Sequence, residues 1–189
     1  FAEEREDIMA CVEAVFSKGE FVGGGIIDGL EESIADTVGV GHAVALNSGT
    51  DALILTLRAM GIGPGDEVIT PPNSFVASAA AIVATGATPV FADVQADQNI
   101  DPAAIEAAIT ENTRAVMPVH LTGRVCNMDA ISAIAEKHAL VVIEDAAQSF
   151  GSKYRDKASG SFGRAGCFSA HPLKNLNAAG DAGFVTTDD

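Results

Sequence analysis

The stretch AVALNSGTDALILTLRAMGIGPGDEVIT, residues 43–70, indicates the fold of this chain. It opens with a short apolar run, 43–47, and continues as a segment with apolar residues at helical spacing, 51–60. A glycine-rich turn then leads into a second apolar run, 67–70. A strand, a helix and a strand in this order are typical of a β-α-β unit with parallel strands.

The same alternation continues on both sides of this stretch and predicts an α/β fold with a mostly parallel central sheet. Strands are expected at residues 43–47, 67–70, 88–92, 115–119, 140–143, 166–169 and 183–186. Helices are expected at residues 4–17, 28–38, 51–60, 75–84, 102–109 and 128–138. Asp101 and Pro102 supply an N-cap and a first-turn proline for one of these helices, and Asn127 supplies the N-cap of another.

Composition narrows the class of protein and of partner. A chain of 189 residues with 48% hydrophobic residues can bury the core of one domain, or of two at most. The formal net charge of -15 disfavours attraction to nucleic acid or to anionic membranes, so small molecules and other protein chains are the expected partners. Three widely spaced cysteines suggest neither disulfides nor a metal site and favour a reducing, cytoplasmic setting. The apolar runs are also too short to span a bilayer.

Polar residues are expected to gather at the carboxyl edge of the sheet, where such folds bind ligands. After the first expected strand, Ser48, Gly49 and Thr50 turn into a helix. They suit either an ordinary N-cap or a phosphate site made of free N–H groups and hydroxyls. After the fifth expected strand, Asp145 follows buried-type residues. Its carboxylate either caps the next turn or holds a protonated nitrogen of a ligand, with Gln148 available for a neighbouring hydroxyl.

Lys174 lies among small, apolar and turn-forming residues in CFSAHPLKNLNAAGDAG, residues 167–183. Apolar surroundings favour the neutral amine, which can attack a carbonyl and form a Schiff base, although a loop lysine is more often a plain surface residue. Ser169 ends the preceding strand and could donate its hydroxyl to a phosphate. A phosphate turn, a strand-end carboxylate and a sheltered lysine match the phosphate, the pyridine nitrogen and the aldehyde of pyridoxal phosphate (PLP).

Five segments carry a resemblance to a known family: NSGTDAL (47–53), GIGPGDEVITPPNSFVASAAAI (61–82), GATPVFADV (86–94), VIEDAAQSFGSKY (142–154) and CFSAHPLKNLNAAGDAGFVTTDD (167–189). In this order and spacing they resemble the DegT/StrS-type sugar aminotransferases, which are fold type I PLP-dependent enzymes. The resemblance implies a three-layer fold. It also implies that residues 1–189 are an incomplete PLP-binding large domain that lacks the small C-terminal domain.

Carried over position by position, the resemblance implies a role for each candidate site residue. Gly49, Thr50 and Ser169 would hold the phosphate, and Lys174 would form the Schiff base. Asp145 would pair with the pyridinium nitrogen, Gln148 would contact the ring hydroxyl, and Phe75 would stack on the ring. Phe75 would otherwise be read as a core residue at a helix start. Ala170 and AAGDAG (178–183) depart from the usual family pattern without changing these positions.

The implied function is amino transfer from glutamate to a nucleotide-linked keto-sugar by a cytoplasmic homodimer, with the fragment inactive by itself. Dehydratases of the family have a histidine at the position that Lys174 occupies here. The lysine therefore favours the aminotransferase. A non-catalytic protein that binds PLP or a sugar remains an alternative. A dinucleotide-dependent dehydrogenase fits less well, because GVGHAV (39–44) places its glycines before the strand and lacks the third glycine.

Overall fold

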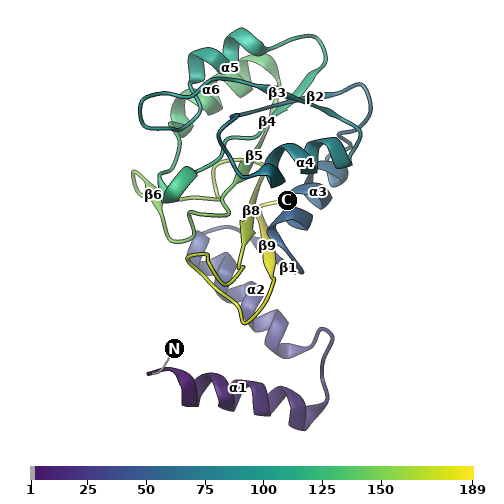
Figure 1. The fold of residues 1–189 in the computed structure, drawn as a ribbon, viewed down its shortest axis with the longest axis vertical. Coiled ribbons are helices and arrows are strands. Elements are labelled where there is room, and N and C mark those ends of the chain that lie inside the picture. Colours follow the sequence, from purple (N-terminus) through teal and green to yellow (C-terminus); the bar gives the residue numbers. More distant parts are fainter. Residues whose placement is uncertain (1–2) are drawn as a thin grey trace.

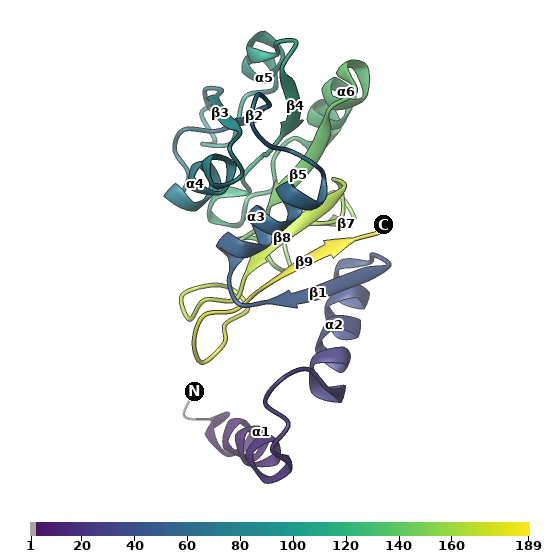
Figure 2. The same cartoon turned by 90° about the vertical axis from the view of Figure 1, so that its right-hand side faces the viewer.

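A seven-stranded sheet forms the centre of the protein in the computed structural model, which describes residues 3–189 (Figure 1). Every neighbouring pair of strands is parallel except those made by β9, which runs antiparallel to both of its neighbours (Figure 2). The spatial order is β1 (His42–Leu46), β9 (Gly183–Thr187), β8 (Ala165–Ser169), β5 (Val141–Asp145), β4 (Thr113–Val116), β2 (Glu67–Thr70) and β3 (Thr88–Phe91). The predicted mostly parallel sheet is therefore confirmed.

Helices cover both faces of this sheet and make the fold three-layered, as expected. Those that pack on it are α2 (Gly25–Val38), α3 (Gly49–Ala59), α4 (Val76–Ala84), α5 (Pro102–Ala108) and α6 (Met128–His138). By contrast, α1 (Arg5–Lys18) buries none of its side chains and lies apart from the sheet in both views (Figures 1 and 2). Within residues 3–189, no helix combines the length and the apolar character that crossing a membrane requires.

Alternation along the strands assigns the two faces, because successive side chains of a strand point to opposite sides. On β5, Ile143 packs with the residues of α3 and α4, whereas Val142 packs with those of α5 and α6. On β8, Cys167 faces α3, whereas Phe168 stacks on Phe184 of β9 and packs against α2. The apolar runs of the sequence are therefore strands buried on both faces.

Local capping sets where several helices begin. The Asp101 side chain accepts the N–H of Ala103 in front of Pro102, and Asn127 accepts the N–H of Ala130, so both predicted N-caps are confirmed. The Ser48 hydroxyl accepts the Asp51 N–H, and α3 consequently begins two residues before the predicted start. The cap directs the first N–H groups of α3 toward the carboxyl edge of the sheet.

Three features differ from the prediction. The strand expected at 115–119 ends earlier, at Val116, because Pro118 has no N–H for the ladder; Val119 pairs again only as an isolated bridge to Asp145. A small hairpin of β6 (Lys153–Tyr154) and β7 (Lys157–Ala158) was not predicted. A one-turn helix, η1 (Leu121–Gly123), was not predicted either.

Candidate active site

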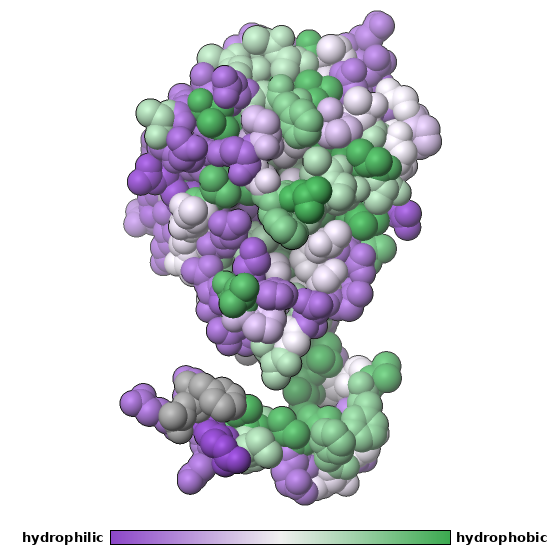
Figure 3. Space-filling view, viewed as in Figure 1, coloured by the Kyte–Doolittle hydropathy of each residue, from purple (hydrophilic) through white to green (hydrophobic). Residues whose placement is uncertain are grey.

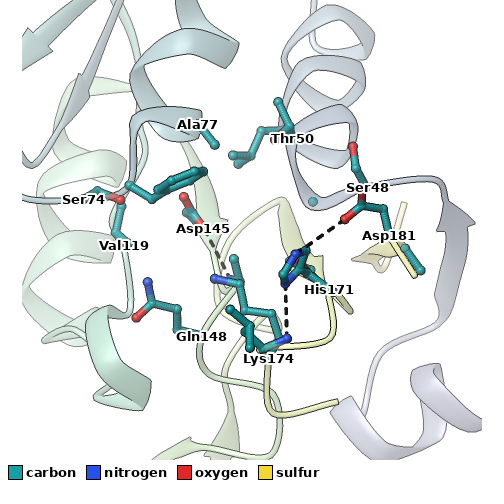
Figure 4. Close-up of a pocket in the computed structure, with 17 residues that line it drawn as sticks. Ser48, Thr50, Ser74, Ala77, Val119, Asp145, Gln148, His171, Lys174 and Asp181 are labelled. Atoms are coloured by element: carbon teal, nitrogen blue, oxygen red, sulfur yellow. Dashed lines mark hydrogen bonds and ion pairs between the residues drawn. The ribbon is translucent and has the colours of Figure 1, made fainter. Parts of the chain in front are cut away.

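A cavity of about 370 Å³ opens at the carboxyl ends of β5 and β8. Figure 4 shows its walls: the turn before α3, the start of α4, the turn after β5 and the loop after β8. All seven residues singled out from the sequence line it, namely Gly49, Thr50, Phe75, Asp145, Gln148, Ser169 and Lys174. Gly49 and Lys174, which are 125 positions apart in the sequence, thus meet around one space.

The start of α3 makes one end of the cavity suitable for an anion. The first N–H groups of an α-helix have no partner inside the helix, and the helix dipole adds partial positive charge there. Gly49 and Thr50 occupy these first positions and line the cavity, and Ser169, which packs against Gly49, lines it beside them. Ser48 acts as the N-cap, so the capping interpretation is correct for that residue and leaves the phosphate interpretation open for its neighbours.

Two glycines allow α3 to approach the ends of β8 and β9 this closely. A Cβ on Gly49 would lie 2.6 Å from the Cβ of Ser169, and a Cβ on Gly183 would overlap the backbone carbonyl carbon of Ser48. Neither position has room for a side chain. The glycines therefore set the distance between the helix start and the Ser169 hydroxyl.

Asp145 is a buried carboxylate, 5% exposed, that faces the cavity from the end of β5. The Ser78 hydroxyl donates to its Oδ2 at 2.6 Å, and the Ala147 N–H donates to its Oδ1 at 3.2 Å. Burial raises the pKa of Asp145 above the usual range of a carboxyl, and these two donors, with the charges of His120 and Lys174, oppose that rise. A cationic ligand group at this carboxylate would favour its ionised form. The capping interpretation also holds, since Ala147 belongs to the turn that follows.

Phe75 is 69% exposed and is the N-cap residue of α4. Phe75 also lines the cavity, so the alternative of a buried core residue is wrong. A large apolar ring exposed beside a cavity offers a flat surface for an aromatic ligand.

Gln148 presents a hydrogen-bond donor to the cavity. Its Oε1 accepts the N–H of Thr122 at 2.8 Å, which fixes the orientation of the side-chain amide. The Nε2 group then remains for a ligand atom (Figure 4). Because an amide nitrogen only donates, the ligand atom at Gln148 must be an acceptor.

Lys174 is half-buried in the loop after β8, and its backbone N–H donates to the backbone carbonyl of His171. Both residues line the cavity. The His171 Nδ1 accepts the N–H of Leu173, and its Nε2 lies 3.9 Å from Asp181 Oδ1. The loop therefore holds one primary amine and one imidazole in the same cavity as the Asp145 carboxylate.

Sequence reasoning missed several residues of the site. Ser74 and Asp181 line the cavity, and Ser78 binds the Asp145 carboxylate from behind. Nothing in the spacing of SFVAS (74–78) indicated a contact with a residue 67 positions later. Within residues 3–189, no group of three or more His, Cys, Asp or Glu side chains is placed to hold a metal ion.

The donor set fits PLP group by group. An anion can bind at the start of α3, and a protonated ring nitrogen can bind at Asp145. Gln148 suits an ionised ring oxygen, Phe75 suits the ring face, and Lys174 suits the aldehyde carbon.

Comparison with known proteins agrees with the fit of the cavity to PLP. A UDP-N-acetyl-3-dehydro-alpha-D-glucosamine 3-aminotransferase of Acidithiobacillus ferrooxidans is 49% identical over 100% of this chain and 52% of its own length. The crystal structure of S. venezuelae DesV in complex with a ketimine intermediate has a TM-score of 0.97, with 44% identity, and covers 100% of this chain and 51% of that one. The structure of NtdA from Bacillus subtilis with bound cofactor PMP has a TM-score of 0.93 and 37% identity, over 100% of this chain and 43% of that one.

The chain thus spans about half the length of the relatives it matches. Residues 2–189 match a single family along their whole extent. This chain belongs to the DegT/DnrJ/EryC1/StrS aminotransferase family.

Proposed function

We propose that residues 1–189 form the PLP-binding large domain of a homodimeric, cytoplasmic aminotransferase that moves an amino group from glutamate to a nucleotide-linked keto-sugar. The observation that carries this proposal is the meeting of the Asp145 carboxylate and the Lys174 amine in one cavity that also has an anion site at a helix start. The nucleotide-sugar substrate is supported by the name of the Acidithiobacillus relative and the cofactor by the PMP-bound NtdA structure.

In this proposal, Gly49, Thr50 and Ser169 bind the phosphate, Phe75 covers the ring, and Gln148 donates to the ring oxygen. PLP, when bound, supplies an electron sink for the carbon that loses its proton. Asp145 holds the proton on the ring nitrogen, which that chemistry requires.

Lys174 has two tasks in this account. Its amine would hold PLP at the aldehyde carbon while no substrate is bound, and the freed amine would move the proton at the carbon that bears the amino group. The alternative histidine chemistry of family dehydratases is disfavoured, because a lysine stands at this position. His171 lies in the same loop three positions earlier, with its Nε2 at 3.9 Å from Asp181 Oδ1.

The homodimer is supported by apolar side chains around the cavity mouth. Phe75, Val76 and Leu173 are exposed by 69%, 67% and 87%, and the apolar patch over α4 is visible in Figure 3. A patch of this kind beside a binding cavity is typical of a surface that a partner chain covers. Separate, buried thiols at Cys126 and Cys167 suit the reducing conditions of the cytoplasm.

Amino transfer can be tested with the natural full-length chain, PLP, glutamate and a panel of UDP-, dTDP- and GDP-linked keto-sugars. We expect formation of 2-oxoglutarate in a coupled assay and an amino-sugar product by mass spectrometry. Lys174→Ala should remove turnover, whereas Lys153→Ala, at an exposed position on β6, should retain it. Tight PLP binding without turnover on any member of the panel would favour a non-catalytic binding protein instead. Residues 1–189 alone are expected to be inactive.

A further inference from the structure

A chain of two hydroxyls leads from the cavity wall to the Asp145 carboxylate. Ser78 is 1% exposed, and its Oγ lies 2.6 Å from Asp145 Oδ2. Ser74 lines the cavity, and its Oγ lies 2.9 Å from Ser78 Oγ. None of the roles proposed above uses either serine.

The chemistry of the groups decides which atom donates in each of these two hydrogen bonds. An ionised carboxylate only accepts hydrogen bonds, so Ser78 must donate to Asp145. The Ser78 oxygen is then free to accept the proton of Ser74. Both hydroxyl dipoles thus point toward the carboxylate, and each strengthens the other in a low-dielectric interior.

We propose that Ser78, supported by Ser74, is a positioning residue that orients the Asp145 carboxylate and favours its ionised form before PLP arrives. This inference rests on the proposed function, in which Asp145 holds the ring nitrogen. With Ala147 on Oδ1 and Ser78 on Oδ2, each carboxylate oxygen has one protein donor. The plane of the carboxylate is thereby set, and further lone pairs remain for a ligand.

The position of Ser78 also links two parts of the site. Ser78 lies in the first turn of α4, where its N–H donates to the carbonyl of Phe75 at 3.3 Å. One helix start therefore carries the ring that we expect on the face of the cofactor and the hydroxyl that orients the carboxylate. A shift of α4 would move both together.

Other titratable groups near Asp145 must be separated from the effect of Ser78. Lys174 from the loop after β8 and His120 from the segment after β4 favour the ionised carboxylate. The charge of Asp145 also acts on the buried Cys167 thiol of β8. Glu144 precedes Asp145 on β5, and its carboxylate is hydrogen-bonded to His120. An Asp145→Asn background removes the carboxylate while leaving all of these groups in place.

The first test therefore measures unfolding of the natural chain without PLP, between pH 5 and 8, for Ser78→Ala with and without Asp145→Asn. Removal of a donor to the ionised form raises the folded pKa of Asp145 further above its unfolded value. Relative to wild type, the added penalty is absent below the wild-type folded pKa of Asp145 and grows as pH rises from that pKa toward the higher folded pKa of the variant. We expect Ser78→Ala to raise the unfolding equilibrium constant about ten-fold more at pH 8 than at pH 5, and this difference to vanish in the Asp145→Asn background.

Ser159→Ala is the matched control. Ser159 is also 1% exposed and also donates at 2.6 Å, but to the neutral carbonyl of Ser149. The stability lost in Ser159→Ala should therefore not depend on the protonation of Asp145. An equal pH dependence in the Ser159 and Ser78 variants, or persistence of the Ser78 effect in the Asp145→Asn background, would overturn the inference.

The second test measures the dissociation constant of PLP. We expect Ser78→Ala to raise it about ten-fold, Ser78→Thr to restore it, and Ser78→Cys, a weak donor of similar size that guards against misfolding of the alanine variant, to fall between. If Asp145→Asn weakens PLP binding and none of the Ser78 variants does, the positioning role is wrong and the proposed function stands. If Asp145→Asn leaves PLP binding unchanged, the proposed role of Asp145 fails instead.

Discussion

Gly49→Ala should disturb the anion site at the start of α3, because Gly49 is a point of close contact between α3 and β8. The added Cβ would lie 2.6 Å from Ser169 Cβ, 3.1 Å from Ser169 Cα and 3.3 Å from the carbonyl oxygen of Phe168. Carbon atoms pack at about 3.5–4.0 Å, so the first contact overlaps by roughly 1 Å. Two of the three opposing atoms belong to backbone and cannot turn away.

The expected cost follows from that overlap. Overpacking of this kind destabilises a fold by about 1–3 kcal/mol. If the start of α3 moves by about 1 Å instead, an N–H···O bond of about 2.9 Å lengthens to about 3.9 Å and is lost. Each bond to a charged acceptor is worth about 1.5–3 kcal/mol, so the dissociation constant of PLP should rise about ten-fold to about a hundred-fold.

Gly29→Ala is the matched control, since Gly29 lies in the interior of α2 and a Cβ there meets nothing within 4 Å. Alanine should stabilise that helix by about 0.5–1 kcal/mol without changing PLP affinity. Denaturant unfolding and PLP titration of both variants give the comparison. Gly49→Ala with wild-type stability and wild-type PLP affinity would refute the claim that α3 must approach Ser169 this closely.

Two further predictions concern the amide of Gln148 and the buried thiols. Gln148→Glu keeps an acceptor for the Thr122 N–H but replaces the amide donor that faces the cavity. PLP titration should therefore show an affinity loss of about ten-fold or more, with little change in the melting temperature. Unchanged affinity would mean that the amide does not donate to the ligand. Burial raises the pKa of Cys126 and of Cys167 to about 12, whereas Cys11 is exposed. Iodoacetamide at pH 8 should therefore label only Cys11 in the native protein, as read by peptide mass spectrometry. Label on Cys167 would contradict its burial.

Regular elements could be predicted where pattern and local chemistry agree. The apolar run of β2 and the helical spacing of α6 gave the bounds that the structure has, 67–70 and 128–138. The hairpin of β6 and β7 escaped because its turn places Arg155 at φ 54°, a left-handed conformation that sequence patterns assign to glycine or asparagine. The reversed direction of β9 also has no signature within its own residues.

The candidate site could be predicted to the level of which residues gather, since strand ends of a parallel sheet share one edge. Its finer geometry depends on contacts that no local pattern encodes. The Thr122 N–H that orients Gln148 and the Ser78 hydroxyl that binds Asp145 both come from distant segments. The exposure of Phe75 is likewise a result of packing, because the same residue could start a buried helix.

Covalent capture of PLP shows directly whether Lys174 is the residue that binds the cofactor aldehyde. The natural chain is loaded with PLP, treated with borohydride, digested and examined by mass spectrometry. We expect a phosphopyridoxyl group on Lys174, which lines the cavity with Asp145, and none on the exposed Lys153 and Lys157. Label on Lys153 or Lys157 in place of Lys174, or no label at all, would contradict it.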